Sequence, residues 1–149
     1  MIRVQAEDFD VGAEFAKFTE RRTDIGGVAL FVGLVRDALS DGEAVKAMTL
    51  EHYPGMTERQ LEAIEAEARK RWVLDDALVI HRYGRLEPGS RIVLVMTASA
   101  HRQAALESCQ FLIDWLKTKA PFWKLEETPQ GGQWVEAKDS DDSAAEKWG

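Results

Sequence analysis

Two stretches of the chain repeat apolar residues at the spacing of an amphipathic helix. One runs from Met56 to Trp72 and the other from His101 to Lys119, where Pro121 ends it. Their apolar positions recur in steps of three or four and are Leu61, Ile64, Ala68, Trp72 in the first and Ala105, Cys109, Leu112, Leu116 in the second. Thr57 and Gln60 predict a capping box for the first helix. We therefore expect two main helices, each with one buried face.

The remaining pattern predicts strands and one short helix. Phe9 to Arg21 has the spacing of a short helix, with Asp10 as its N-cap. Apolar or alternating runs bounded by turn residues predict strands at 1–5, 28–35, 45–53, 77–83, 91–99, 122–127 and 133–137. We expect the strands at 28–35 and 45–53 to form a hairpin around the polar loop 37–44.

This order of elements favours an α+β fold, in which two main helices pack on a mostly antiparallel sheet. A chain of 149 residues is long enough to bury a proper core, so we expect one domain over residues 1–149. Its last segment, about 138–149, is polar and is expected to be either a flexible tail or a docked one.

Composition narrows the classes of function. The formal net charge of −7 argues against a nucleic-acid binder, and no apolar run approaches the roughly 20 residues of a membrane span. The N-terminus lacks the pattern of a signal peptide, so we expect a cytoplasmic protein. A single cysteine, Cys109, excludes an internal disulfide, and His52, His81 and His101 lack the spacing of a metal site.

The first candidate for chemistry is Ser99-Ala100-His101-Arg102, where a strand ends and a helix begins. Free backbone N–H groups and the positive end of the helix dipole attract anions at such a place. Adding His101 and Arg102 fits a phosphate ligand. The alternative is that Ser99 caps the helix and both cationic side chains are solvated.

Further candidates are the cations near the end of the same helix. Lys117 and Lys119 lie in its last turn, and Lys124 follows Pro121 among aromatic residues. A lysine that is partly desolvated and close to other cations has a lowered pKa and is a better proton acceptor. The ordinary alternative is that these lysines complement the helix dipole, and that Arg36, which opens a polar loop, is solvated. Cys109 is expected to be a small core residue rather than a sulfur carrier.

Six separated blocks of the sequence, in the same order, resemble the large subunit family of molybdopterin synthase. They are FVGLVRD at 31–37, LEHYPGMTE at 50–58, IHRYGRLEPG at 80–89, TASAHR at 97–102, LKTKAPFWKLE at 116–126 and GGQWVEA at 131–137. The resemblance covers nearly the whole chain from about residue 26, and several ordered blocks are a far more specific signal than one short motif.

The resemblance implies an α/β hammerhead-type fold and a homodimer at the centre of a heterotetramer. Each large subunit would bind one small ubiquitin-like sulfur-carrier subunit, whose C-terminal glycine carries a thiocarboxylate. The substrate would be cyclic pyranopterin monophosphate, which receives two sulfurs and becomes molybdopterin. The resemblance implies no metal and no organic cofactor.

The resemblance also implies the residues of the site. Lys117 and Lys124 match the two lysines thought essential for catalysis. The substrate-binding positions implied in this chain are Leu34, Val35, Arg36, His101, Arg102, Lys117, Lys124, Leu125 and Glu126. Leu34 and Leu125 are expected to line the pocket at most, and Phe31 and Met48 to be core or pocket wall. Lys138 stands where relatives can have arginine, and its contact stays open.

The chemistry of the residues agrees with this assignment, because substrate and sulfur donor are both anionic and need fixed positive charge. We expect Arg102 and His101 to bind phosphate, Lys117 to act as general acid/base or to engage the donor carbonyl, and Lys124 to stabilise developing charge. His101 and Lys117 stand at opposite ends of one predicted helix, roughly 24 Å apart. We therefore expect composite sites in a homodimer, with Lys117 and Lys124 from one chain and His101 and Arg102 from its mate.

Two other classes of function stay open. A non-catalytic adaptor that binds a ubiquitin-like tail would need the lysines for affinity and not for turnover. A phosphohydrolase or lyase that acts on a cyclic phosphate would be active without a sulfur donor.

Overall fold

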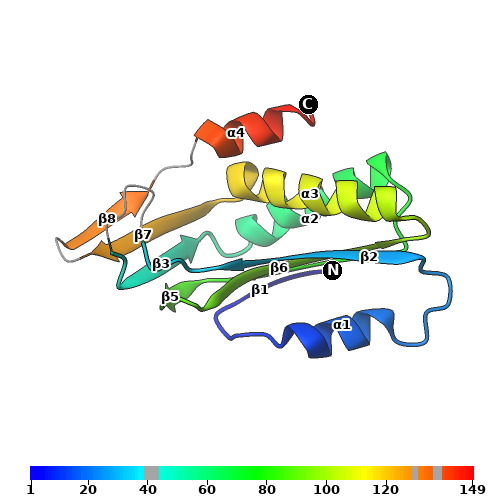
Figure 1. Ribbon diagram of the computed structural model, residues 1–149. Coiled ribbons are helices and arrows are strands. Elements are labelled where there is room, and N and C mark those ends of the chain that lie inside the picture. The colour runs from blue at the N-terminus through cyan, green and yellow to red at the C-terminus, as the bar shows by residue number, and fades with distance from the viewer. Residues whose placement is uncertain (39–43, 129–130, 136–138) are drawn as a thin grey trace.

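The computed structural model describes residues 1–38, 44–128, 131–135 and 139–149, which form two four-stranded sheets and four helices (Figure 1). In chain order the elements are β1 (Ile2–Gln5), α1 (Val11–Thr19), β2 (Gly27–Leu34), β3 (Ala47–His52), α2 (Met56–Arg71), β4 (Asp76–Arg82), β5 (Gly84–Leu86), β6 (Arg91–Ser99), α3 (Arg102–Lys119), β7 (Phe122–Thr128), β8 (Gly131–Val135) and α4 (Asp139–Glu146).

The first sheet has the strand order β1-β4-β6-β2 and the second β5-β3-β7-β8. Only the β1–β4 pair is parallel among these strand pairs, so the predicted α+β class with mostly antiparallel sheets is confirmed. Helix α1 lies on one face of the first sheet and α2 and α3 lie on the other (Figure 1). Covered on both faces, β6 is buried along almost its whole length, which explains its continuous apolar sequence.

The two main helices bury the faces predicted for them. Leu61, Ile64 and Ala68 of α2 are buried, as are the predicted positions of α3, namely Ala105, Cys109, Leu112 and Leu116. These side chains share one core with Val79, Val93 and Val95, which point from β4 and β6 toward the same side. The α2–α3 layer therefore rests directly on the first sheet.

The predicted hairpin of 28–35 and 45–53 is wrong. Strand β2 pairs with β6, whereas β3 lies in the other sheet between β5 and β7. Ala38 and Ala44 form an isolated antiparallel bridge, but strands β2 and β3 on either side of it lie in different sheets. A connection this long does not impose a register as a two-residue turn does, and each strand pairs where its apolar face is covered.

The helix starts agree with the sequence at α1 and differ at α2. The carboxylate of Asp10 accepts the N–H of Ala13 at 3.0 Å, as predicted for an N-cap. The predicted Thr57–Gln60 capping box does not form. Gly55 is the N-cap, and its N–H donates to Oε2 of Glu58 at 2.5 Å. Thr57 is fully buried, and its hydroxyl donates to the carbonyl of Tyr53 at 2.8 Å, which ties the helix to the end of β3.

A close backbone contact fixes the start of α3. Gly26 donates its N–H to the carbonyl of Ser99 at 2.9 Å, and a Cβ at Gly26 would lie 1.8 Å from the carbonyl oxygen of Ala100. Only glycine fits this approach. The Ser99 hydroxyl donates to the carbonyl of Val73 instead of capping the helix, and His101 is the N-cap residue, without a side-chain cap bond.

The polar C-terminal segment is docked from Asp139 onward. Helix α4 lies on the outer side of α3 (Figure 1), and Trp148 after it donates its indole N–H to Oδ2 of Asp114 at 2.7 Å. The Trp148 ring also contacts Trp72 and Phe111, with centroid distances of 5.6 and 5.8 Å. Lys138 lies outside the described residues. No helix in the described parts of the chain is long and apolar enough to cross a membrane.

Candidate functional site

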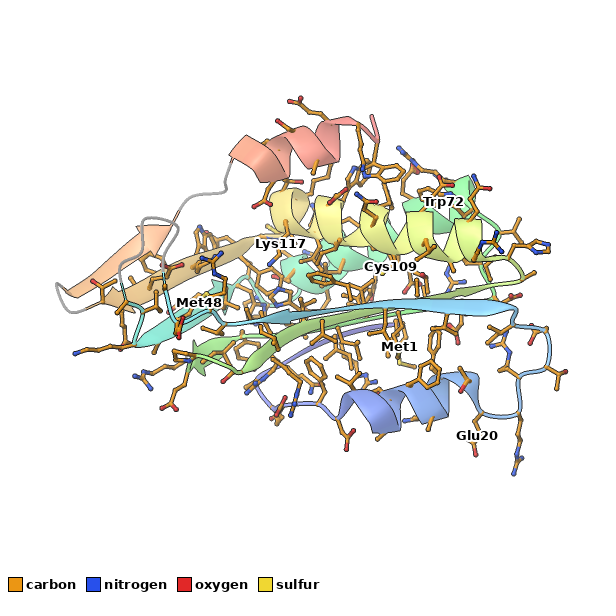
Figure 2. The ribbon with its side chains drawn as sticks, in the orientation of Figure 1. Met1, Glu20, Met48, Trp72, Cys109 and Lys117 are labelled. Atoms are coloured by element: carbon orange, nitrogen blue, oxygen red, sulfur yellow. The ribbon has the colours of Figure 1, made fainter. Side chains whose placement is uncertain are left out.

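A cavity of about 130 Å³ opens where the C-terminal end of α3 meets both sheets. Figure 2 shows Lys117 at this end of α3 and Met48 on β3 nearby. Six of the nine predicted site residues line the cavity: Leu34, Val35, Arg36, Lys117, Lys124 and Glu126. Its other lining residues are Ala38, Val45, Met48 and Ile92. The structure thus brings together three cations, one carboxylate and an apolar wall.

The segment ending at Arg36 is held in place by backbone contacts. The β2–β6 register shifts between Gly33 and Leu34, and such an irregularity re-aims the side chains that follow it. Val35 then donates its N–H to the carbonyl of Ser90 at 2.9 Å and accepts the N–H of Gly89 at 2.8 Å. These two bonds fix Val35, which is buried, and leave Arg36 exposed at the mouth of the cavity.

The last turn of α3 separates its two lysines. Lys117 lines the cavity. The ammonium of Lys119 lies 4.7 Å from the centroid of the Trp115 ring, on a different face of the helix. Of these two lysines, only Lys117 therefore lines the cavity.

Strand β7 supplies the other side of the cavity. Side chains alternate along a strand, so Phe122, Lys124 and Glu126 share one face. Leu125 lies on the opposite face, close to Gly132, and does not line the cavity. Leu125 was expected to line the pocket at most, and because side chains alternate along β7 it does not line this cavity.

Glu126 is the carboxylate of the cavity and is 8% exposed. Its Oε1 lies 3.8 Å from Nζ of Lys124, whereas its Oε2 is buried without a hydrogen-bond partner among the described residues. With Arg36 and Lys117 also present, the positive charges outnumber the negative one. An anion is the ligand that such an arrangement attracts.

His101 and Arg102 stand at the other end of α3 and do not line this cavity. Both are exposed. Because α3 extends from Arg102 to Lys119, His101 and Lys117 lie roughly 24 Å apart. Within one chain, His101 and Arg102 are therefore not brought together with the residues of the cavity.

The single thiol has no place in the site. Cys109 is 6% exposed and faces the sheet from the middle of α3, with its Sγ 4.0 Å from the carbonyl of Val95 (Figure 2). Burial raises the pKa of the Cys109 thiol to about 11, so the thiolate that sulfur chemistry requires does not form near neutral pH.

Sequence reasoning missed three residues of the cavity wall, Ala38, Val45 and Ile92. Met48 was expected to be either a core residue or part of the pocket wall, and it lines the cavity. Val45 and Ile92 look like any strand residue in the sequence, and only the meeting of two sheets reveals them. Among the described residues, no group of three or more His, Cys, Asp or Glu side chains is placed to hold a metal ion.

A comparison with known protein families identifies the family of this chain. The family described as "MoaE protein" matches residues 4–119 of this chain. The chain therefore belongs to the MoaE family.

Individual relatives narrow this further. The chain is 54% identical over 148 residues to the molybdopterin synthase catalytic subunit of Ralstonia nicotianae, covering 99% of this chain and 84% of that one. The structure of the molybdopterin biosynthesis MoaE protein from Burkholderia ambifaria superimposes with a TM-score of 0.84 at 51% identity, covering 99% of this chain and 97% of that one. These relatives confirm the family that the sequence blocks indicated and its class, a sulfur-transferring enzyme of molybdenum cofactor biosynthesis.

A more distant structure shares the fold. It is the complex of subunits 1 and 2 of molybdopterin-converting factor from Helicobacter pylori, with a TM-score of 0.72 at 19% identity, covering 93% of this chain and 90% of that one.

Proposed function

We propose that this chain converts cyclic pyranopterin monophosphate to molybdopterin, with two sulfurs delivered as the C-terminal thiocarboxylate of a small ubiquitin-like subunit. The observation that carries the proposal is the cavity at the end of α3, where Arg36, Lys117 and Lys124 surround one buried carboxylate. The thiocarboxylate and the phosphate are both anions, and fixed cations let the two approach each other.

The two lysines have different surroundings, which supports different roles. Lys117 is on a helix and reaches the cavity from one side, where it acts as general acid/base or engages the donor carbonyl after sulfur has left. Lys124 is on β7 beside Glu126, where it stabilises charge at the reacting carbons and assists proton transfer. Leu34, Val35 and Glu126 shape the pocket around the substrate.

We further propose that each site is composite. His101 and Arg102 are exposed at the start of α3 and do not line the cavity that contains Lys117, so they are available to a second copy. In a two-fold dimer each helix start meets the other chain's helix end, and two equivalent sites form. The phosphate is then held by His101, Arg102 and the helix N-terminus of the mate.

The relatives' description as a catalytic subunit implies a further subunit. In the Helicobacter pylori structure two subunits of molybdopterin-converting factor form a complex. For this chain we propose a homodimer that binds one small sulfur-carrier subunit on each side, which gives a heterotetramer located in the cytoplasm.

The test is to supply cyclic pyranopterin monophosphate to the purified chain with and without the thiocarboxylated small subunit, and to measure dithiolene formation. We expect dithiolene only when both are present. Binding of the small subunit without any dithiolene would make the chain an adaptor. Opening of the cyclic phosphate by the chain alone would make it a phosphohydrolase or lyase.

A further inference from the structure

Four aromatic rings form a series of contacts that connects the two sheets. His81 of β4 stacks on Phe122 of β7 with a centroid distance of 3.8 Å and an interplanar angle of 19°. The Phe122 ring is also 6.0 Å from the ring of His52 on β3, and the His52 ring is 4.5 Å from that of Tyr83, measured between centroids. The proposed function assigns no part to these rings.

Hydrogen bonds fix the His81 ring in one neutral state. Its Nδ1 lies 2.8 Å from the carbonyl oxygen of Arg82, so Nδ1 carries the proton and donates it. The side chain is 3% exposed, and burial lowers the pKa of His81 to about 3, with a smaller contribution from the positive charge of Lys117. The ring is therefore neutral near pH 7 and lies within electrostatic reach of Lys117.

Phe122 lies between the two lysines along the chain. Helix α3 ends at Lys119, and β7 begins at Phe122 after only Ala120 and Pro121. Phe122 shares a face of β7 with Lys124, two residues further on. Phe122 is thus part of the short connection between the helix that carries Lys117 and the strand that carries Lys124.

We propose that His81 is a positioning residue, whose ring holds Phe122 against the first sheet and so keeps Lys117 and Lys124 on one cavity. This inference rests on the proposed function. His81 touches no reacting atom in this role, and its flat neutral ring is the property that matters. A displacement of a reacting group by about 1 Å can cost as much as 100-fold in rate, so a loosened Phe122 lowers the rate far more than it weakens binding.

Two substitutions separate the flat ring from the hydrogen bond. His81→Phe keeps a ring against Phe122 and loses the bond to the Arg82 carbonyl, whereas His81→Asn keeps a donor and loses the ring. We expect His81→Asn to lower kcat about 10- to 100-fold with KM for the pterin substrate nearly unchanged, and His81→Phe to keep kcat within about threefold. Ile80→Val is the matched control. Ile80 is the buried neighbour on the same strand that faces the opposite core, and its variant should keep kcat.

The opposite result overturns the proposal: a His81→Asn enzyme with normal kcat, or a His81→Phe enzyme as slow as His81→Asn. If His81→Asn does not fold, Phe122→Leu removes the same stack from the other strand and must produce the same loss of kcat. A readout independent of activity is NMR of the isotopically methylated lysines, in which the Lys117 and Lys124 signals should move in His81→Asn and stay in His81→Phe. A wild-type chain that forms no dithiolene at all refutes the proposed function, whereas unmoved lysine signals in His81→Asn refute the positioning role by themselves.

Discussion

The two ends of α3 carry the same kind of side chain in opposite surroundings. At the C-terminal end, Lys117 stands in a cavity whose other walls come from β2, β3, β6 and β7 and the adjoining loop. At the N-terminal end, His101 and Arg102 are exposed, although the backbone beneath them is locked by the contact between Gly26 and Ala100. The first end therefore lines a cavity with residues of several strands, whereas the second presents exposed charges on a fixed backbone. This difference is the reason for proposing that the second end contributes to a site on a second copy of the chain.

The largest effect is expected at the cavity end. Lys117→Ala and Lys124→Ala should each lower dithiolene formation by about 10²- to 10⁴-fold, because each removes a positioned acid/base or charge-stabilising group. Folding and binding of the small subunit, measured by circular dichroism and by titration, should persist. Lys119→Ala is the control, since its ammonium lies over Trp115 and not in the cavity, and it should keep normal turnover. Near-normal turnover of either lysine variant would remove that lysine from the mechanism.

The next prediction joins the two ends directly. His101→Ala and Lys117→Ala homodimers should each be inactive, and they are unfolded, mixed and refolded together. Random pairing makes about half of the dimers mixed, and each mixed dimer has one intact composite site, so about a quarter of normal activity should return. If mass spectrometry confirms mixed dimers and no activity returns, either both residues belong to the site of one chain or one of them is not part of catalysis.

A smaller effect concerns the pH dependence of stability, to which the buried side chain of His81 contributes. The folded-state pKa of His81 is about 3, below its ordinary value of 6.5, so the unfolded chain binds more protons between these values. The contribution of His81 to stability is therefore complete above about pH 6.5 and is lost as the pH falls toward 3, by about 1.4 kcal/mol per pH unit. Urea unfolding at pH 7, 6 and 5 should show a shallower pH dependence for His81→Phe than for the wild type. Equal slopes would contradict it.

The smallest effect lies midway between the two ends. Cys109→Ala should keep most turnover and lose about 1 kcal/mol of unfolding free energy, because it removes one buried sulfur from a packed helix face. Thermal melting and dithiolene formation, measured on the same preparation, check both parts. A folded Cys109→Ala protein without activity would contradict the prediction that this thiol is dispensable for sulfur transfer.

Local patterns in the sequence predicted much of the fold. The apolar faces of α2 and α3, the Asp10 cap and the strand β6 all follow from periodicity or from one side chain acting on nearby backbone. The pairing of β2 with β6, and of β3 with β7, depends on contacts distant in the chain, which the long loop after β2 does not reveal. Helix α4 is polar, and the residue after it, Trp148, packs on α3. The spacing of apolar residues within α4 does not predict this contact.

The candidate site divides in the same way. The sequence indicated the cationic residues of the site, because their residue types and the ordered sequence blocks single them out. The wall residues Val45 and Ile92 are ordinary strand residues, and they become part of a site only where the two sheets meet. In the sequence His81 lacks the spacing of a metal site, and its stack on Phe122 joins positions that are far apart in the chain.

The small size of the cavity has a consequence for inhibitor design. Pockets that enclose a drug-sized molecule usually measure about 300–1,000 Å³, so the 130 Å³ enclosed by one chain suits a fragment of a few heavy atoms. A compound confined to it has few atoms with which to gain affinity. If the sites are composite as proposed, an acidic fragment extended toward His101 and Arg102 of the second copy would contact both protomers. Such a compound should bind the assembled dimer and not the isolated chain, and should raise the melting temperature of the dimer as its concentration increases.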